Sequence, residues 1–209
     1  MDLRMDDARS EVTLTAGPLL LRPWRPEDAP ALLGAYADPA MRRWAATRMA
    51  DADDAAGWLA AQREGWVAGT RFGFAVTDTA LGGELVGNVA LKRAEPSSDT
   101  AEVGYWTTAS ARGRGVAPRA LTALCDWAFA TFAGDGLTRL ELVHQADNEA
   151  SCRVAEKCGF APAGVLPAFP PAYPLAGHRH ARSAAVEGIS SADRRAGSAG
   201  TAGGRATPR

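Results

Sequence analysis

The sequence predicts an α/β domain with a mixed sheet, in which an antiparallel meander precedes a strand–helix–strand–helix–strand unit. Three strand-like segments lie close together between residues 71 and 108, which favours antiparallel neighbours. Strand-like and helix-like segments then alternate, which favours parallel pairing around a crossover helix. The chain has 209 residues, 46% of them hydrophobic, and is long enough for one domain with a full core.

We place this single domain at residues 15–186. Residues 1–14 are mostly polar and are expected to form a flexible N-terminus. Residues 187–209 consist largely of Gly, Ala, Ser and Arg, and we expect this tail to be disordered because it has almost nothing to bury.

The first part of the domain predicts one strand and two helices. Residues 19–22 are a short, mainly apolar run that ends at a proline, which is typical of a strand. Asp28 is a plausible cap for a helix that follows it. Residues 51–69 begin with an acidic turn, which suits the positive end of a helix dipole.

The meander is predicted from three segments: residues 71–78, 84–94 and 99–108. The first alternates apolar and other side chains, as a half-buried strand does. Gly104, in the middle of the third, is consistent with a β-bulge.

The second half of the domain predicts a helix that starts near Val116, a strand at 137–145, and a second helix. Asn148 is expected to cap that second helix, and Gly159 lies just past its end, where a left-handed residue is favoured. A strand follows from residue 160, and residues 177–186 are expected to form a final strand at the edge of the sheet.

The turn before the first of these helices, "ARGRGVAP", has the features of an anion site. The first amides of a helix have no partner inside it, and with the helix dipole they attract phosphate. Gly113 and Gly115 allow close approach of the backbone, while Arg112, Arg114 and Arg119 add positive charge. No Walker loop or complete G-x-G-x-x-G fingerprint is present. An ordinary strand-to-helix turn with solvated arginines remains the alternative.

The stretch "AEVGYWTTASARGRGVAPRALTALCDWAF" resembles the core of the GNAT N-acetyltransferase superfamily. Arg112, Gly115 and Ala117 match its R/Q-x-x-G-x-G/A loop, and "DNEASCRVAEKCGF" is similar to its next helix. "LLLRPWRPEDAPAL" resembles the opening of the RimJ/RimL branch, which acetylates ribosomal-protein N-termini. The resemblance implies a GNAT-like acyl-CoA N-acyltransferase fold with a splayed pair of parallel strands.

The resemblance also implies direct transfer of an acetyl group from acetyl-CoA to a primary amine, with a ternary complex of enzyme, acetyl-CoA and amine. A non-catalytic module that binds acyl-CoA as a sensor is the alternative. The implied cofactor-binding residues lie on the third meander strand, on the loop and at the cap of the second helix: Tyr105, Trp106, Thr107, Arg112, Gly113, Arg114, Gly115, Val116, Ala117 and Asn148. A backbone N–H near Tyr105 or Trp106 would hold the thioester oxygen.

Two residues are candidate catalysts by the same resemblance. Glu102 is the best-placed carboxylate to accept the amine proton, and its alternative is a solvated or salt-bridged strand residue. Ser151 is a candidate acid for the leaving thiolate, and with Asn148 its alternative is simple helix capping. Some relatives carry a glutamate shortly after the last core strand, and "PAFPPAYP" has no acid there.

The acceptor is predicted to contact Trp24, Arg43 and Trp44, although core aromatics are an equal alternative. A peptide N-terminus, an amino acid, a polyamine or an amino sugar remain open as acceptors. The formal net charge of −1 argues against nucleic acid as a partner. No apolar run is long enough to span a membrane, and we expect a monomer or homodimer.

Cysteine usage and the start of the chain predict a cytoplasmic protein. The three cysteines are odd in number and lack C-x-x-C spacing, which argues against structural disulfides. The acidic start lacks the pattern of a secretory signal. The three histidines do not combine with the cysteines at zinc-finger spacing, so we expect no metal.

Overall fold

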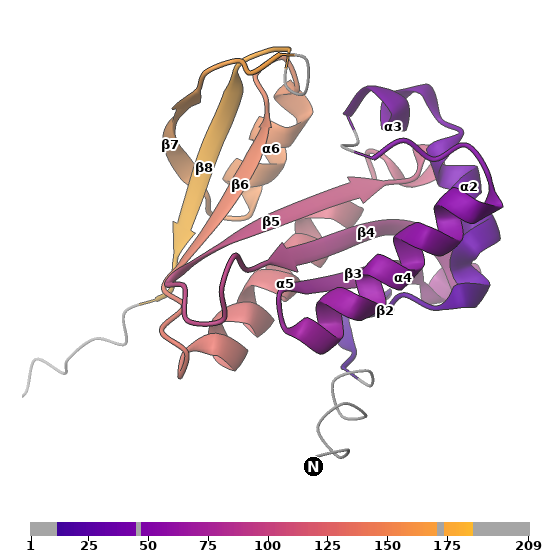
Figure 1. The fold of residues 1–209 in the computed structure, drawn as a ribbon, viewed down its shortest axis with the longest axis horizontal. Helices are drawn as coiled ribbons and strands as arrows, with labels where there is room; N and C mark the ends of the chain where they lie inside the picture. Colours follow the sequence, from indigo (N-terminus) through magenta and orange to yellow (C-terminus); the bar gives the residue numbers. More distant parts are fainter. Residues whose placement is uncertain (1–11, 45–46, 171–173, 186–209) are drawn as a thin grey trace, which may run out of the picture.

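The computed structural model describes residues 12–44, 47–170 and 174–185, so the tail at 187–209 and most of segment 1–14 lie outside the described residues. These parts form a mixed eight-stranded sheet with the strand order β1-β2-β3-β4-β5-β6-β8-β7 (Figure 1). The strands are β1 (Leu14–Ala16), β2 (Leu19–Pro23), β3 (Arg71–Asp78), β4 (Glu84–Lys92), β5 (Thr100–Thr107), β6 (Arg139–Gln145), β7 (Ala161–Leu166) and β8 (Gly177–Ser183).

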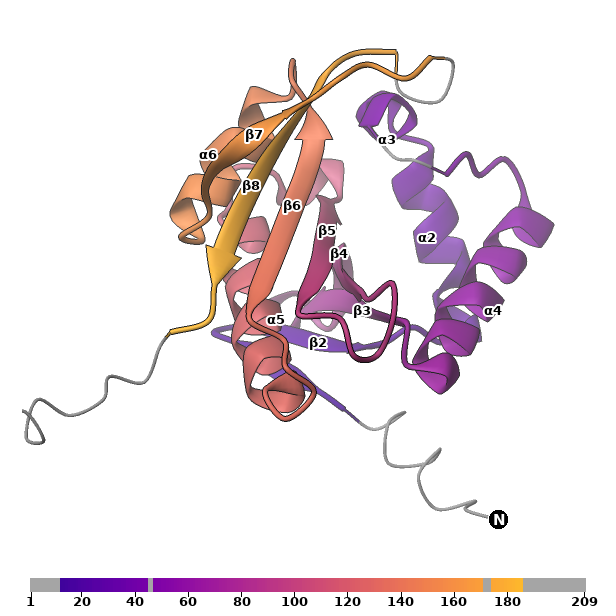
Figure 2. The ribbon, with the colours of Figure 1, turned by 60° about the vertical axis from the view of Figure 1, so that its left-hand side comes forward.

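Helices cover both faces of the sheet (Figure 2). The first three are α2 (Ala29–Tyr36), α3 (Pro39–Trp44) and α4 (Ala52–Ala68), and α2 and α4 lie against one face. The other face is covered by α5 (Val116–Phe132) and α6 (Glu149–Lys157). Short 3₁₀ turns occur at η1 (Pro26–Asp28), η2 (Thr79–Leu81) and η3 (Ala109–Ala111).

Two apolar clusters fill the space between the layers. The larger contains the apolar face of α5 and side chains of β2 to β6, with Phe74, Leu91 and Leu121 fully buried. The smaller surrounds Trp24 and contains buried side chains of α2 and α4. The sheet is therefore packed from both sides, which accounts for most of the apolar surface buried on folding.

The predicted meander is confirmed, because β3, β4 and β5 pair antiparallel in chain order. The half-buried pattern predicted for β3 is wrong, since every residue of the strand after Arg71 is buried. Helices lie against both faces of β3, so no side of this strand is left to solvent.

The parallel pair β5–β6 separates halfway along its length. β5 pairs with β6 only from Thr100↔Arg139 to Val103↔Leu142. Beyond that point β5 stays paired with β4, and β6 stays paired with β8 up to Gln145. The two strands then diverge toward their C-terminal ends (Figure 1), which confirms the splayed parallel pair.

Two details of the predicted sheet are wrong. The strand at 177–183 is not at the edge, because β8 pairs with both β6 and β7 and leaves β7 at that side of the sheet. Gly104 makes no bulge, since it pairs with Ala90 in an unbroken register; the irregularity in the meander lies at Val76/Thr77 in β3. Long-range pairing decides both features, and local sequence patterns do not report it.

Helix caps follow the sequence with one exception. Gly159 is left-handed with φ 76° after α6, as predicted, and α4 has the predicted acidic first turn, to which the structure adds a cap: Asp51 accepts the Asp54 amide. Asp28 does stand at the start of α2, but its carboxylate caps no amide of that helix. It binds the Arg22 guanidinium and the Arg25 amide instead, because a charged guanidinium is a stronger hydrogen-bond donor to a carboxylate than a neutral helix amide is.

We expect Gly87→Ala to destabilise the sheet. A Cβ at Gly87 would lie 2.5 Å from the Trp106 carbonyl oxygen on β5, a backbone atom that cannot move away easily. The free energy of unfolding should fall by ~1–3 kcal/mol in urea denaturation. Gly104→Ala is the matched control, because a Cβ there meets no heavy atom within 4 Å. Equal effects of the two substitutions would contradict the observed approach of β4 to β5.

Candidate active site

The N-terminus of α5 presents free amide groups. Gly113 and Gly115 have φ values of 75° and 73°, a left-handed conformation that favours glycine. Among the described residues, no hydrogen-bond acceptor is found for the amides of residues 115–117. Pro118 occupies the first turn, where its missing N–H costs nothing. The loop therefore offers a row of donors at the positive end of a helix dipole.

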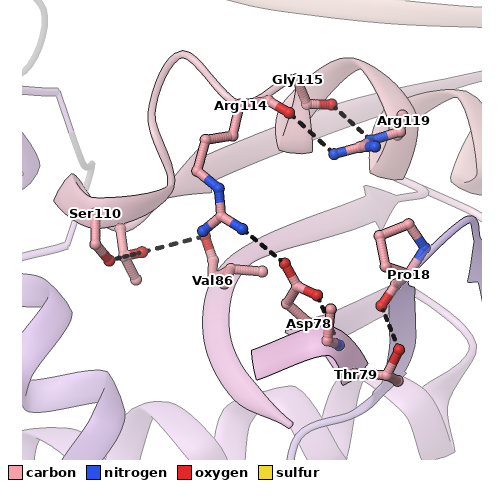
Figure 3. Close-up of polar contacts among 10 residues, drawn as sticks. Pro18, Asp78, Thr79, Val86, Ser110, Arg114, Gly115 and Arg119 are labelled. Carbon is pink, nitrogen blue, oxygen red and sulfur yellow. Dashed lines mark hydrogen bonds and ion pairs between the residues drawn. The ribbon is translucent and has the colours of Figure 1, made fainter. Parts of the chain in front are cut away.

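The arginines of this loop are held by protein partners, while the side chains of Arg112 and Arg114 stay partly exposed, at 41% and 43%. Arg112 forms an ion pair with Asp38, and its guanidinium lowers the pKa of that carboxyl. Arg114 Nη2 donates to Asp78 Oδ2 at 3.0 Å, and the Asp78 side chain is only 4% exposed (Figure 3). Arg119 folds back and donates to the carbonyl oxygens of Arg114 and Gly115, at 2.9 and 3.2 Å.

These contacts fix the loop before any anion binds. Asp78 also caps η2 through the Ala80 amide, so Arg114 ties the loop to the end of β3. Nothing in the local sequence of Asp38 and Asp78 marks them as partners of a loop that lies 36 to 74 residues away, so only the fold identifies them.

The edge of β5 that faces the divergence has unpaired peptide groups. The Thr108 amide donates to Val86 on β4 at 3.0 Å. Successive peptide groups of a strand point in opposite directions. The amides of Tyr105 and Thr107 consequently point away from β4, toward the edge that β6 has left. Trp106 points its amide toward β4, so of the two residues predicted near the thioester only Tyr105 has its N–H at the open edge.

The side chains of Tyr105 and Ser151 meet on the α6 side of the sheet. The Tyr105 hydroxyl lies 3.0 Å from Ser151 Oγ, and Ser151 is only 8% exposed. Burial raises the pKa of the Tyr105 phenol, while the bond to Ser151 opposes that rise. At neutral pH the phenol is therefore protonated and can donate a proton. The family motif predicts a role for the backbone of Tyr105 only, and the contact of its side chain with Ser151 is a feature of the fold.

Asn148 serves as the cap of α6. Its Oδ1 accepts the Ser151 amide at 3.2 Å, and the Ser151 amide also lies 2.9 Å from the Asn148 carbonyl oxygen. The capping alternative considered for this pair is thus present in the structure. A second role of Asn148 toward a cofactor stays a prediction.

Glu102 lies on the face of β5 opposite Tyr105, where β5 and β6 are still paired. Its Oε1 is 2.5 Å from Lys92 Nζ, and both side chains are partly exposed. It lines a surface pocket together with Glu141 and Val143 of β6. The salt-bridged alternative is therefore present, in a position two residues before the strands diverge.

The structure separates Trp24 from the other two residues predicted to contact the acceptor, Arg43 and Trp44. Trp24 is buried in the smaller core cluster, where its Nε1 donates to Asn88 at 2.9 Å and its ring packs on Trp58 and Trp106. This arrangement fits the core alternative for Trp24.

Arg43 and Trp44 lie on α3, across from the start of α6 (Figure 1). The Arg43 guanidinium stacks on Trp44 at 4.5 Å and donates to Asp147 at 2.9 Å. The Arg43–Asp147 ion pair therefore connects α3 to the loop between β6 and α6.

The fold and this site define a class. A sheet that opens between two parallel strands, beside a helix whose first amides are free, provides an edge for an extended ligand and a cradle for its phosphates. Residues 18–161 match the family model described as "Acetyltransferase (GNAT) domain". The chain belongs to the GNAT acetyltransferase family, as its motifs predicted.

Relatives within the family are of the RimJ/RimL type. The Escherichia coli (strain K12) ribosomal-protein-serine acetyltransferase is 38% identical over 84 residues, which are 40% of this chain and 45% of that protein. The match thus spans less than half of the relative's length. None of the matches named here points to an acyl-CoA sensor without catalysis.

Solved structures share the fold. Mycobacterium smegmatis RimJ in complex with CoA-disulfide aligns with a TM-score of 0.71 and 24% identity over 83% of this chain and 86% of that one. The microcin C7 self-immunity acetyltransferase MccE, in complex with acetyl-CoA and AMP, aligns with a TM-score of 0.68 and 16% identity over 80% and 93% of the two chains. In the part of our chain that the structure describes, no helix has the length and apolarity required to cross a membrane.

We expect the Tyr105 phenol to make stability fall at alkaline pH. Its folded-state pKa lies above the unfolded value, so its contribution is complete below pH ~10 and is lost as the pH rises toward the folded value. Between those two pKa values the free energy of unfolding of the wild type should fall by up to ~1.4 kcal/mol per pH unit. The Tyr105→Phe variant should not show this fall. Urea denaturation at about pH 8 and about pH 10.5 measures this difference.

Ser151→Ala provides the control. The variant removes the hydrogen bond that favours the phenolate, so its alkaline loss of stability should be steeper than that of wild type. Parallel curves for the three proteins would show that Tyr105 is not a buried phenol bonded to Ser151.

Proposed function

We propose that this protein transfers an acetyl group from acetyl-CoA to the N-terminal α-amine of a peptide or protein. The observation that carries the proposal is the position of two sets of free amides: the Tyr105 and Thr107 N–H groups of β5 and the first amides of α5. Both belong to one continuous stretch of chain, from β5 through η3 into α5. A pyrophosphate bound at α5 would direct the arm of the cofactor along the open edge of β5.

The amides of α5 supply the anion site in this proposal, and the arginines support it. Arg112 and Arg114 are held by Asp38 and Asp78, so they shape the loop and lend it positive charge without closing it. A donor set arranged in advance binds an anion without the cost of ordering the loop.

The thioester would lie beside Tyr105. Its backbone N–H faces the open edge and would donate to the thioester oxygen as negative charge develops there. The amine attacks the carbonyl carbon, the C–S bond breaks and the thiolate of CoA leaves. Ser151 would give its hydroxyl proton to the thiolate and regain a proton from the Tyr105 phenol at 3.0 Å, which is protonated at neutral pH. The Tyr105 phenolate would then take a proton from water as the products leave.

The amine would arrive from the opposite face, on which Glu102 lies. Glu102 and Glu141 are neighbours across β5 and β6, and they supply negative charge near an incoming ammonium. Glu102 would accept the amine proton directly or through water. Arg43 and Trp44 on α3 would contact residues of the peptide beyond its N-terminus.

An α-amine suits this site because the demand on the base is small. With a pKa of ~7.8, about one α-amine in seven is neutral at pH 7, whereas about one lysine side chain in 2,500 is neutral. Glu102 is partly exposed and paired with Lys92, so an acceptor that is already partly neutral asks less of it than a lysine would. The similarity to the ribosomal-protein-serine acetyltransferase supports the same acceptor class.

Gly115→Asp should abolish tight binding of acetyl-CoA. The substitution places a carboxylate among the free amides of α5, where the pyrophosphate is proposed to bind. Gly115→Asn is the control, because Asn and Asp tolerate the left-handed conformation equally and differ in charge. In calorimetric titrations the Gly115→Asp variant should bind acetyl-CoA roughly 10–100-fold more weakly than the Gly115→Asn variant. Equal affinities would place the pyrophosphate elsewhere.

The acceptor class is tested with a thiol-release assay on a panel of amines. We expect kcat/KM at pH 7 to be roughly 300-fold higher for short peptides with a free N-terminus than for N-blocked peptides carrying one lysine. Polyamines and amino sugars complete the panel. Release of thiol with none of these amines would refute the transfer activity, and a preference for lysine would refute the α-amine acceptor.

Two variants separate the base from the acid in the same assay. Glu102→Gln should reduce kcat about 10²-fold on lysine peptides and less on N-terminal peptides, because α-amines are partly neutral already. Ser151→Ala should lower kcat by the same factor on both, since the thiolate is common to all acceptors. Wild-type rates in both variants would show that catalysis depends on positioning alone.

A further inference from the structure

Three histidines and one cysteine converge outside the proposed acetyl-transfer machinery. They are His144 at the end of β6, Cys152 in the first turn of α6, and His178 and His180 on β8. Each residue offers one ligand atom, and these four atoms all lie within 4.8 Å of one another. We refer to these four residues as the His₃Cys cluster.

Two separations in the His₃Cys cluster match those of a tetrahedral metal centre. Zinc binds thiolate at ~2.3 Å and imidazole nitrogen at ~2.0–2.1 Å, so a tetrahedral site has S···N separations of about 3.6 Å. Cys152 Sγ lies 3.6 Å from His144 Nε2 and 3.4 Å from His178 Nδ1. Cys152 is therefore already at the required separation from two of the histidines, and all four ligand atoms lie within 4.8 Å of one another, so small side-chain shifts would bring them onto one ion.

The histidines in the cluster have nitrogen lone pairs available. His144 Nδ1 lies 2.8 Å from the Gln145 carbonyl, an acceptor, so Nδ1 carries the proton and Nε2 keeps its lone pair toward Cys152. A second hydrogen bond of this kind commonly orients a metal-bound histidine.

Hydrogen bonds between the cysteine and the histidines do not account for the buried position of His180. It is 4% exposed, and within the described residues neither of its ring nitrogens has a hydrogen-bond partner. An unpartnered buried polar group is unfavourable, and such groups are rare in native proteins. A bound cation would satisfy one nitrogen of this ring.

We propose that the His₃Cys cluster binds one zinc ion per chain. Four protein ligands form a closed set, which is typical of a structural site and leaves no open position for catalysis. The ion would join α6, which packs on the sheet through side chains such as Ala155, to the antiparallel pair β6 and β8. Binding releases the thiol proton of Cys152 as the S–Zn bond forms. The inference does not depend on the proposed transfer reaction.

The test uses the untagged full-length chain, reduced and freed of metal with a chelator. We expect zinc to bind with a stoichiometry of one and to raise Tm by about 5–10 °C at roughly 100-fold excess over Kd. Cobalt(II) serves as the spectroscopic probe. It should give the visible bands of a tetrahedral centre and a near-ultraviolet charge-transfer band from the thiolate.

Variants assign these signals to the cluster. Cys152→Ala should lose the charge-transfer band and the zinc-dependent rise in Tm, and His180→Gln should bind at least about 10-fold more weakly. Cys158→Ser is the matched control, because its Sγ donates to the Pro118 carbonyl and a hydroxyl can replace it there. Failure of a variant to fold leaves the cobalt spectrum of wild type as the decisive measurement. The proposal is wrong if that spectrum lacks the thiolate band, or if Cys152→Ala keeps the rise in Tm.

Discussion

The site depends on one constraint of the sheet: β5 pairs with β6 only as far as Val103. β5 continues beside β4, and β6 continues beside β8, so the two parallel strands separate. Peptide groups that would be paired in a continuous sheet are left free on β5. Free N–H and C=O groups along a strand edge are a template for pairing, so this half-exposed edge can accept an extended ligand that completes the sheet.

The loop that follows β5 is organised by buried charge. Asp78 is almost completely buried and binds Arg114, and Asp38 binds Arg112. Both contacts cross from the loop to distant parts of the chain, so they hold the two left-handed glycines in place beside α5. The two guanidinium groups form ion pairs with the aspartates, and the first amides of α5 remain free hydrogen-bond donors. Affinity for an anion would therefore come from arranged backbone dipoles supported by nearby positive charge.

The two faces of β5 divide the proposed chemistry. Tyr105 and Ser151 lie on the α6 face and can supply a proton, while Glu102 lies on the opposite face and can accept one. Strand alternation enforces this separation, because neighbouring side chains point to opposite sides of the sheet. The acid and the base could not exchange their proton directly, and each would act on its own side of the thioester.

The sequence alone determined the elements and the family. Periodicity and capping residues predicted the meander, α4, α5 and α6, and the loop at 112–117 together with "DNEASCRVAEKCGF" identified the acetyltransferase fold. Tertiary structure decided what depends on long-range pairing: the place of β8 inside the sheet, the regular register at Gly104, and the burial of Trp24. It also decided which partners the arginines take and brought His144, Cys152, His178 and His180 together from three elements. Local sequence patterns reflect the conformational preferences of residues that are close in the chain. These contacts arise only when segments distant in the chain come together in the folded sheet.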